Sequence, residues 1–144
     1  WLPSYGPEMR GGTANCSVIV SDEDVASPMV DKADAIVAMN LPSLDKFENK
    51  VRPGGVLVIN SSIIERKSTR DDITVVYCDA MKIAEDVGNP KGANVAILGA
   101  LMEKMPIVSV DKMMEAIRIE LGERKLRFLE GNKKALVAGM EAAK

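Results

Sequence analysis

The short segment between Ser4 and Gly12 gathers the residue types of this sequence that could bind a ligand or a partner chain. Its candidate site residues are Ser4, Tyr5, Gly6, Pro7, Glu8, Arg10, Gly11 and Gly12. The glycines and prolines specify a backbone that ordinary residues do not hold. Arg10 offers a planar fork of N–H donors for a carboxylate or a phosphate. Two interpretations stay open: a loop that binds an anion or a partner, or a structural loop in which Arg10 bonds Glu8 or backbone carbonyls.

The residue types used most often in catalysis are scarce. The sequence has no histidine, which is the usual general base near pH 7 and the commonest metal ligand, and its two cysteines are Cys16 and Cys78. Neither cysteine belongs to a CxxC pair, so the chain cannot supply the four thiolates of its own iron–sulfur cluster. Apolar neighbours predict that both cysteines are buried in strands rather than reactive, and a cytoplasmic setting disfavours a disulfide.

Three weaker candidates lie further along the chain. Asn94 either bonds a neighbouring loop or caps the following helix, and we favour the cap because Asn is a preferred N-cap residue. Lys91 beside Gly92 could contact a phosphate, although a solvated lysine is the simpler interpretation. Ser61 and Ser62 follow a predicted strand, but neither a GxSxG elbow nor a histidine accompanies them. An independent hydrolase or transferase is therefore the least supported class.

Length, composition and charge exclude several further classes. The chain has 144 residues, of which 47% are hydrophobic and 28% charged, with a net charge of −2. This composition is typical of a single globular domain and lacks the basic excess of a general nucleic-acid binder. The longest apolar runs are far shorter than the roughly 20 residues that span a bilayer. With no signal-peptide pattern, we expect a cytoplasmic protein that binds neither membrane nor nucleic acid.

Apolar and β-branched runs alternate with helical patterns. The runs predict strands at Ala14–Val20, Asp34–Met39, Val56–Asn60 and Asp72–Cys78. Between the second and third strands, Arg52–Gly55 carries the proline and glycines of a turn. Helices are predicted from Asn40 through Lys50 and over Ala80–Val87, Asn94–Met105, Val110–Leu121 and about Arg124–Ala143, with Asn40, Asp79 and Ser109 as caps. We predict an α/β fold with three layers, α/β/α, a largely parallel sheet and a helical C-terminal segment.

The segment Ser4-Tyr5-Gly6-Pro7-Glu8-Met9-Arg10-Gly11-Gly12 resembles the Ser-Tyr-Gly-Pro-Glu-x-Arg-Gly-Gly signature of one protein family. That family is the gamma subunit, or gamma domain, of the 2-oxoacid:ferredoxin oxidoreductases. Further similarities follow in order at Cys16–Asp22, Arg52–Ser62 and Asn94–Ala100, so the resemblance covers nearly the whole chain. The family's usual first strand and glycine-rich loop are not in this sequence. We therefore expect residues 1–144 to be a single gamma-type domain that is incomplete at its N-terminus.

The resemblance implies a function in a larger enzyme. Members of this family decarboxylate a 2-oxoacid oxidatively, pass the acyl group to coenzyme A and reduce ferredoxin. The resemblance implies alpha, beta and delta-type subunits as partners, with thiamine diphosphate, iron–sulfur clusters and coenzyme A in the complex and no cofactor assigned to this chain. The gamma chain would support assembly and the coenzyme A side of the active site, and would be inactive alone. Its Ser4–Gly12 loop would face the catalytic subunits, with Arg10 bound to an anion or to a partner carboxylate.

The sequence leaves open which 2-oxoacid is the substrate and whether the chain has one of two alternative functions. Pyruvate, 2-oxoglutarate and 2-oxoisovalerate are all used in the family, and a short separate gamma chain favours the 2-oxoglutarate or branched-chain types. One alternative is a pure assembly subunit without a ligand. Another is an autonomous α/β domain that binds a nucleotide or coenzyme A without redox activity, although no GxGxxG follows any predicted strand.

Overall fold

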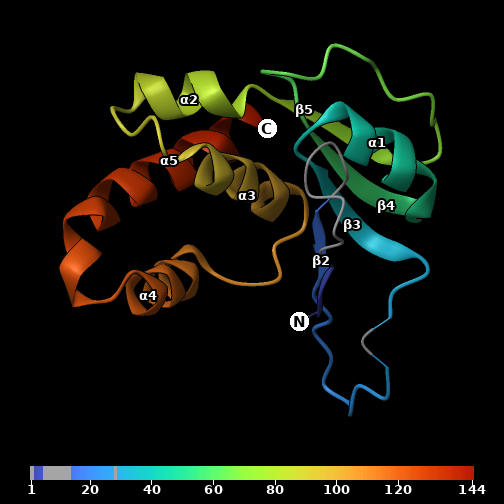
Figure 1. The fold of residues 1–144 in the computed structure, drawn as a ribbon, viewed down its shortest axis with the longest axis horizontal. Helices are drawn as coiled ribbons and strands as arrows, with labels where there is room; N and C mark the ends of the chain where they lie inside the picture. The colour runs from blue at the N-terminus through green and yellow to red at the C-terminus, as the bar shows by residue number, and fades with distance from the viewer. Residues whose placement is uncertain (1, 5–13, 28) are drawn as a thin grey trace.

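A three-stranded parallel sheet forms the centre of the protein. We describe a computed structural model, which places residues 2–4, 14–27 and 29–144 (Figure 1). The strands are β3 (Ala33–Ala38), β4 (Val51–Asn60) and β5 (Thr74–Cys78), in the order β3-β4-β5, and both neighbouring pairs run parallel. The predictions for β3, β5 and the second half of β4 are confirmed to within two residues.

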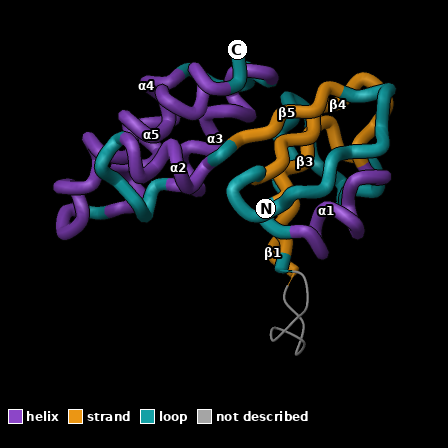
Figure 2. Tube along the Cα trace, turned by 90° about the horizontal axis from the view of Figure 1, so that it is seen from above, coloured by secondary structure: helices purple, strands orange, loops and turns teal. Residues whose placement is uncertain are grey.

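Helices cover both faces of this sheet, as predicted. One face packs on α1 (Leu41–Phe47) and the short 3-10 helix η1 (Glu48–Lys50). The other packs on α2 (Ala80–Asp86), α3 (Ala93–Lys104) and α5 (Leu129–Ala142). Seen from above, α1 lies on one side of the strands and the remaining helices gather on the other (Figure 2).

Strand β4 contributes to the hydrophobic clusters on both faces. Val56 and Val58 point to the side of α3 and α5, and Leu57 and Ile59 point to the side of α1. This alternation follows from the two-residue period of a strand. Because both faces of the sheet are covered, residues Val56–Ile59 of β4 form a continuous apolar run, which is typical of a buried parallel strand.

The turn predicted at Arg52–Gly55 is wrong as a separate element. These residues lie inside β4, where the register with β3 shifts between the pairs Ala33–Val51 and Ala35–Val56. Gly54 has φ of +76°, and its N–H donates to the Asp72 carbonyl at 2.8 Å. The proline and glycines therefore produce an irregularity within a strand that continues beyond them.

Three predicted N-caps are confirmed. The Asn40 side chain accepts from the Ser43 N–H at 2.9 Å at the start of α1, and Asp79 accepts from the Lys82 N–H at 3.3 Å at the start of α2. Ser109 caps α4 (Val110–Leu121) in the same way. Each cap satisfies an N–H group that the first turn of a helix leaves without a partner.

The last predicted helix begins later than expected. Residues Glu123–Phe128 form a 3-10 helix, η2, and α5 starts at Leu129 instead of near Arg124. Gly122 ends α4 with φ of +64° and accepts from the Lys125 N–H at 3.1 Å. The i+3 bond tightens this stretch into 3-10 geometry, which apolar spacing alone does not distinguish from an α-helix.

The first predicted strand is shorter than expected and lies outside the parallel sheet. Strand β2 (Asn15–Ser17) pairs antiparallel with β1 (Leu2–Ser4), and the two form a separate ribbon (Figure 1). Cys16 is exposed in this ribbon, so the prediction that it is buried is wrong, whereas Cys78 is buried as predicted. A two-residue period specifies a strand but not which sheet the strand joins.

Helices α3 and α5 approach each other until their backbones touch. A Cβ added at Gly99 would fall far inside contact distance of the Leu136 carbonyl oxygen, and one at Gly139 would do the same against the Ala96 carbonyl oxygen. Neither contact could be relieved by a side-chain movement, because the opposing atoms belong to the backbone of the facing helix. The two glycines therefore set the distance between these helices.

Replacing Gly99 by Ala should destabilise the protein by about 2 kcal/mol, because overpacking against backbone forces the helices apart. Urea denaturation followed by circular dichroism measures the change. The control is Gly131→Ala in α5, where the three atoms nearest to the added Cβ belong to the Asn89 side chain and lie at 3.3 to 3.4 Å. That variant should keep or raise stability, since Ala is the better helix residue. Equal midpoints for both variants would contradict the close packing.

Candidate functional site

The carboxyl ends of β3, β4 and β5 meet at one edge of the sheet, which we call the carboxyl edge. Open α/β sheets bind ligands in the crevice outside this edge. Polar residues follow each strand here: Asn40 after β3, Ser62 after β4 and Asp79 after β5. The Ser61 N–H donates to the Cys78 carbonyl at 2.9 Å, which extends the ladder of β4 and β5 into the turns.

A hydrogen-bonded unit, the Ser62–Asp79 latch, joins the turn after β4 to the start of α2. The Ser62 hydroxyl donates to Asp79 Oδ1 at 2.7 Å and accepts from the Met81 N–H at 2.9 Å. The Ser62 N–H in turn donates to Asn60 Oδ1 at 3.3 Å, and Asn60 is 2% exposed. The latch uses the serine oxygen for structure, and the sequence has no histidine to activate it as a nucleophile.

Cys78 lies directly beneath the latch at the end of β5. Burial, with a smaller contribution from the Asp79 carboxylate, raises the pKa of the Cys78 thiol to about 11. The nucleophilic form of cysteine is the thiolate, so Cys78 is inert near neutral pH. Cys16, by contrast, is exposed in β2.

Thiol labelling should separate the two cysteines. At pH 8 we expect an alkylating reagent to modify Cys16 and to leave Cys78 unmodified until urea unfolds the chain, a rate difference of at least about a hundredfold. Peptide mass spectrometry before and after denaturation measures both rates, and Cys16→Ser provides the control. Fast labelling of Cys78 in the folded protein would instead show that the reagent reaches the carboxyl end of β5.

A second polar cluster surrounds Glu48 on the α1 side of the sheet. Glu48 is 5% exposed, and its carboxylate accepts from Arg66 Nη2 at 2.9 Å, from the Ser68 hydroxyl at 2.6 Å and from the Thr69 N–H at 3.1 Å. Arg66 also pairs with Asp45 at 3.0 Å. Three of these partners belong to residues 61–73, which connect β4 to the parallel strand β5 without a helix. Glu48 therefore fixes the path of this connection.

Further bonds hold the same connection. Arg70 donates to the Glu48 carbonyl oxygen at 3.1 Å and makes two bonds to Asp72, at 2.5 and 2.6 Å. The Tyr77 hydroxyl accepts from the Ser68 N–H at 3.0 Å. Most of these groups bond one another within the fold, and the exception is the buried Nε of Arg66, which has no hydrogen-bond partner in the described part of the chain and lies 3.0 Å from Asp45. The cluster therefore has a structural role.

Burial tends to raise the pKa of the Glu48 carboxyl, but the hydrogen bonds from Ser68, Arg66 and Thr69 together outweigh it and leave the pKa below its ordinary value. A lowered folded-state pKa gives stability that is fully present above the unfolded-state pKa. That stability is lost as the pH falls through the lower folded-state pKa.

Glu48→Gln should therefore cost about 2 kcal/mol of unfolding free energy at pH 7, because charge-assisted bonds are lost. The difference from the unchanged protein should shrink as the pH falls below about 4.3, the ordinary Glu pKa. Urea unfolding at a series of pH values measures it. Glu115→Gln, which breaks the exposed pair with Arg118 on α4, is the control and should change stability little. A pH-independent difference would rule out the charged role of Glu48.

The signature segment falls almost wholly outside the described residues. Of its predicted site residues, Ser4 ends β1, and the others lie in the part of the chain that the structure does not describe: Tyr5, Gly6, Pro7, Glu8, Arg10, Gly11 and Gly12. The flanking strands pair Ser4 with Asn15 and Leu2 with Ser17. The role of the side chains in the signature segment stays a prediction.

Asn94 does not cap a helix, so that prediction is wrong. Helix α3 begins at Ala93 with Gly92 as its N-cap, and Asn94 is the second helical residue and is exposed. The Gly92 N–H donates to the Asn89 carbonyl at 2.7 Å, and the Gly92 carbonyl accepts from the N–H groups of Val95 and Ala96, both at 2.9 Å. The preceding turn thus starts the helix, and a side-chain cap is not needed. Lys91 is exposed beside it.

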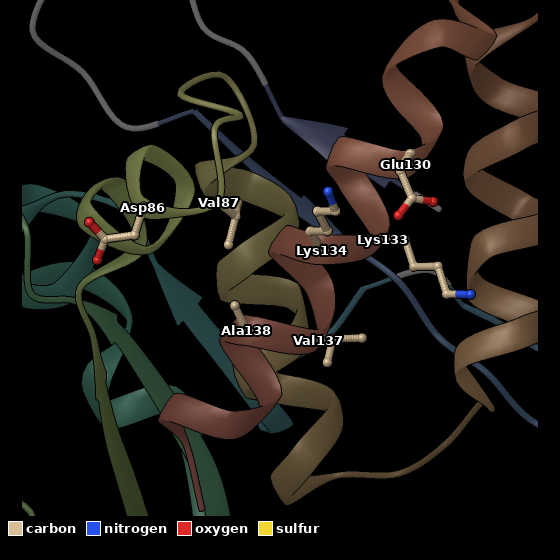
Figure 3. A pocket seen from close by; sticks show the side chains of 7 residues that line it. All are labelled: Asp86, Val87, Glu130, Lys133, Lys134, Val137 and Ala138. Atoms are coloured by element: carbon tan, nitrogen blue, oxygen red, sulfur yellow. The ribbon is translucent and has the colours of Figure 1, made fainter.

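An open depression of about 580 Å³ lies between the end of α2 and α5. Its lining residues are Asp86, Val87, Glu130, Lys133, Lys134, Val137 and Ala138. Figure 3 shows the charged ends of Asp86 and Lys133 pointing away from each other to opposite sides. Asp86 also pairs with Lys82 at 3.0 Å. The charges do not converge on one point, so the depression does not have the geometry of a specific polar site.

In the part of the chain that is placed, no three or more His, Cys, Asp or Glu side chains gather so as to hold a metal ion. Over the same residues, no helix combines the length and apolar character needed to cross a membrane.

Comparison with known proteins identifies the family. Residues 1–142 match the family model described as pyruvate ferredoxin/flavodoxin oxidoreductase. The chain therefore belongs to the pyruvate ferredoxin/flavodoxin oxidoreductase family, and the resemblance in the signature segment is confirmed at the level of the family.

Relatives act on different oxoacids. The chain is 37% identical over its whole length to the ketoisovalerate oxidoreductase subunit VorA of Methanothermobacter marburgensis, of which it covers 30%. It is 35% identical over 79% of its length to the 2-oxoglutarate synthase subunit KorC of Methanocaldococcus jannaschii, of which it covers 62%. The chain thus spans less than two thirds of the length of both relatives.

Solved structures agree on the fold. The gamma subunit of a keto/oxoacid ferredoxin oxidoreductase from Geobacter sulfurreducens superposes with a TM-score of 0.73 at 27% identity, over 85% of this chain and 66% of that one. A 2-oxoglutarate:ferredoxin oxidoreductase from Magnetococcus marinus, solved with 2-oxoglutarate, coenzyme A and succinyl-CoA bound, gives a TM-score of 0.77 at 20% identity. It covers 99% of this chain and 25% of that one, and its likeness establishes the fold alone.

Proposed function

We propose that this chain is the gamma component of a 2-oxoacid:ferredoxin oxidoreductase and acts as one domain over residues 1–144. The observation that carries the proposal is the similarity along the whole chain, which reaches 37% identity to a ketoisovalerate oxidoreductase subunit. The fold of a gamma subunit from the same class of enzymes supports it.

The proposed complex converts a 2-oxoacid, coenzyme A and two oxidised ferredoxins into acyl-CoA, carbon dioxide, a proton and two reduced ferredoxins. The bond between the carboxylate and the oxo carbon breaks, a thioester forms, and two electrons leave for ferredoxin. We propose 2-oxoisovalerate or 2-oxoglutarate as the substrate, since the relatives VorA and KorC are named for these oxoacids and are similarly distant.

The proposed contribution of this chain is structural. With two cysteines and no histidine, residues 1–144 cannot supply the four thiolates of an iron–sulfur cluster of their own. We place the clusters, and the thiamine diphosphate that the family resemblance implies, in other subunits of the proposed complex. In the described polar clusters, the Glu48 carboxylate and the Ser62 hydroxyl bond to groups of this same chain. We assign to the chain the assembly of the complex and the support of its coenzyme A side.

Purification of the tagged chain from its source cells under anaerobic conditions tests the proposal. We expect subunits that carry thiamine diphosphate and iron to copurify, and the complex to reduce ferredoxin only when coenzyme A and a 2-oxoacid are both present. The isolated chain should show no such activity. A chain recovered without partners that binds coenzyme A or a nucleotide by calorimetry would instead favour an autonomous ligand-binding domain.

Within this function, we propose that the Ser4–Gly12 segment faces the catalytic subunits and that Arg10 pairs with an anion or with a partner carboxylate. The support is the signature itself, which begins at Ser4 in the strand that pairs with β2. Asn94, exposed near the start of α3, is a secondary candidate for contact with a neighbouring chain.

Arg10→Ala should lower either partner recovery or turnover of the complex by roughly tenfold or more, because a charge-assisted pair is lost. Arg10→Lys is the matched control, and it should recover only part of the effect, because lysine lacks the bidentate fork. Subunit stoichiometry and ferredoxin reduction are both measured. Unchanged assembly and unchanged turnover in Arg10→Ala would refute the role of Arg10.

A further inference from the structure

Helix α4 is held to the fold by few contacts. It is the one α-helix of the described chain without a buried residue, and the longer stretch of residues 105–134 contains none either. Figure 1 shows α4 at the outer margin of the helices, away from the three strands. A segment with few buried apolar contacts opens at a lower free energy than the core of the same protein.

One apolar stripe attaches α4 to the rest of the chain. Its members recur at the spacing of one helix face and are half-buried against the hydrophobic cluster that includes residues of α3 and α5: Val110, Met113, Met114 and Ile117. Most of the remaining helix is exposed, and Ile119 is 65% exposed. The attachment therefore depends on the partial burial of four side chains.

In the described part of the chain, no side-chain hydrogen bond or ion pair reinforces this attachment. The polar side chains of residues 106–128 bond only within that stretch, where Ser109 caps the helix at Lys112 and Glu115 pairs with Arg118. Apolar contact alone thus holds α4 in place.

The connections at both ends of α4 are local. Before the helix, the Ile107 N–H donates to the Met105 carbonyl at 2.8 Å, and after it the Gly122 N–H donates to the Arg118 carbonyl at 3.2 Å. Gly122 separates α4 from η2 with φ of +64°, and a Cβ added there would meet no described atom within 4 Å. A movement of α4 away from α5 therefore breaks no long-range bond at either end.

The rest of the helical layer does not depend on α4. Helices α3 and α5 touch directly at Gly99 and Gly139, and Asn89 Nδ2 donates to Asn132 Oδ1 at 2.9 Å, which joins α5 to the turn after α2. Helix α4 has 12 residues, and a helix of about this length is marginal in water by itself. Once its stripe leaves α5, α4 therefore unwinds, so that contact and helix are lost together.

We propose that residues 106–128 form a strap that detaches from α5, with α4 unwinding as one unit, while the sheet, α3 and α5 stay folded. The apolar stripe closes the strap, and opening presents Met113, Met114 and Ile117 to solvent. The inference goes beyond the proposed function, since it assigns to the chain a second conformation that needs no partner.

Hydrogen exchange of the full chain, followed residue by residue by NMR, measures the opening. The amides of α4 should share one protection factor, at least about a hundredfold below that of β4, because β4 exchanges only when the whole fold opens. Urea below the unfolding midpoint should accelerate exchange steeply in β4 and little in α4, because opening of the strap exposes little surface.

Two variants separate the strap from the core. Met113→Ala shortens the stripe and should accelerate exchange of the α4 amides roughly tenfold. Ile59→Val, in the cluster on the α1 face, should accelerate exchange in β4 roughly fivefold and leave α4 unchanged, since Ile59 keeps its contacts when the strap is open. The matched control is Ile119→Ala on the exposed side of α4, which should not accelerate exchange there.

Three outcomes would overturn the proposal. Equal acceleration of α4 and β4 by Ile59→Val would show that α4 opens only with the whole fold. Exchange that is graded from the ends of α4 and unchanged by Met113→Ala would show fraying of single turns instead of a unit. Amides of α4 without any protection would show that the strap is not closed in the folded chain.

Discussion

The burial of β4 on both faces is the constraint on which the rest of the structure depends. Leu57, Val58 and Ile59 are fully buried, and successive residues enter opposite hydrophobic clusters. A strand in this position requires hydrogen-bonded neighbours on both sides and helices above and below, since any open side would expose either backbone or apolar groups. The pairing of β3 and of β5 with β4 and the placement of α1 and α3 meet that requirement. Parallel pairing in turn brings the ends of all three strands to a single edge.

The connection from β4 to β5 shows how the fold stabilises a crossover that lacks a helix. Such a segment has no internal ladder of hydrogen bonds, and the buried Glu48 carboxylate supplies partners for it. Taking a carboxylate from water costs several kcal/mol, and the bonds from Arg66, Ser68 and Thr69 offset that cost. Removing one partner would leave a buried charge unpaired, so the cluster acts as one unit. The Glu48 cluster holds the segments that lead into β4 and β5, and the Ser62–Asp79 latch holds the opposite, carboxyl edge of the sheet.

Local signals in the sequence are sufficient to predict a feature where a residue bonds within its own helix. Asn40, Asp79 and Ser109 were identified as caps because a cap bonds an N–H only two or three residues away. Features that depend on distant residues were missed. Glu48 lies 20 positions from Ser68, and nothing in its neighbourhood distinguishes it from a solvated acid. Cys16 has the apolar context of a core strand, yet it lies in a separate ribbon, because sheet membership depends on pairing partners. The family signature was recognisable from nine residues, whereas the position of its side chains was not.

The carboxyl edge of the sheet is the part of the structure that bears most directly on the proposed function. In an autonomous α/β enzyme, this edge would present polar groups that are free to meet a substrate. In the described part of this chain, Ser62 and Asp79 are instead bonded to each other, and Cys78 beneath them is held as an inert thiol. Exposed apolar side chains stand beside these polar groups, namely Met39, Leu41, Ile63 and Met81. An edge whose polar groups are committed and whose apolar groups are free is suited to packing rather than to chemistry. This agrees with the proposed function, in which the chain contributes a rigid surface and other subunits hold the reactive groups.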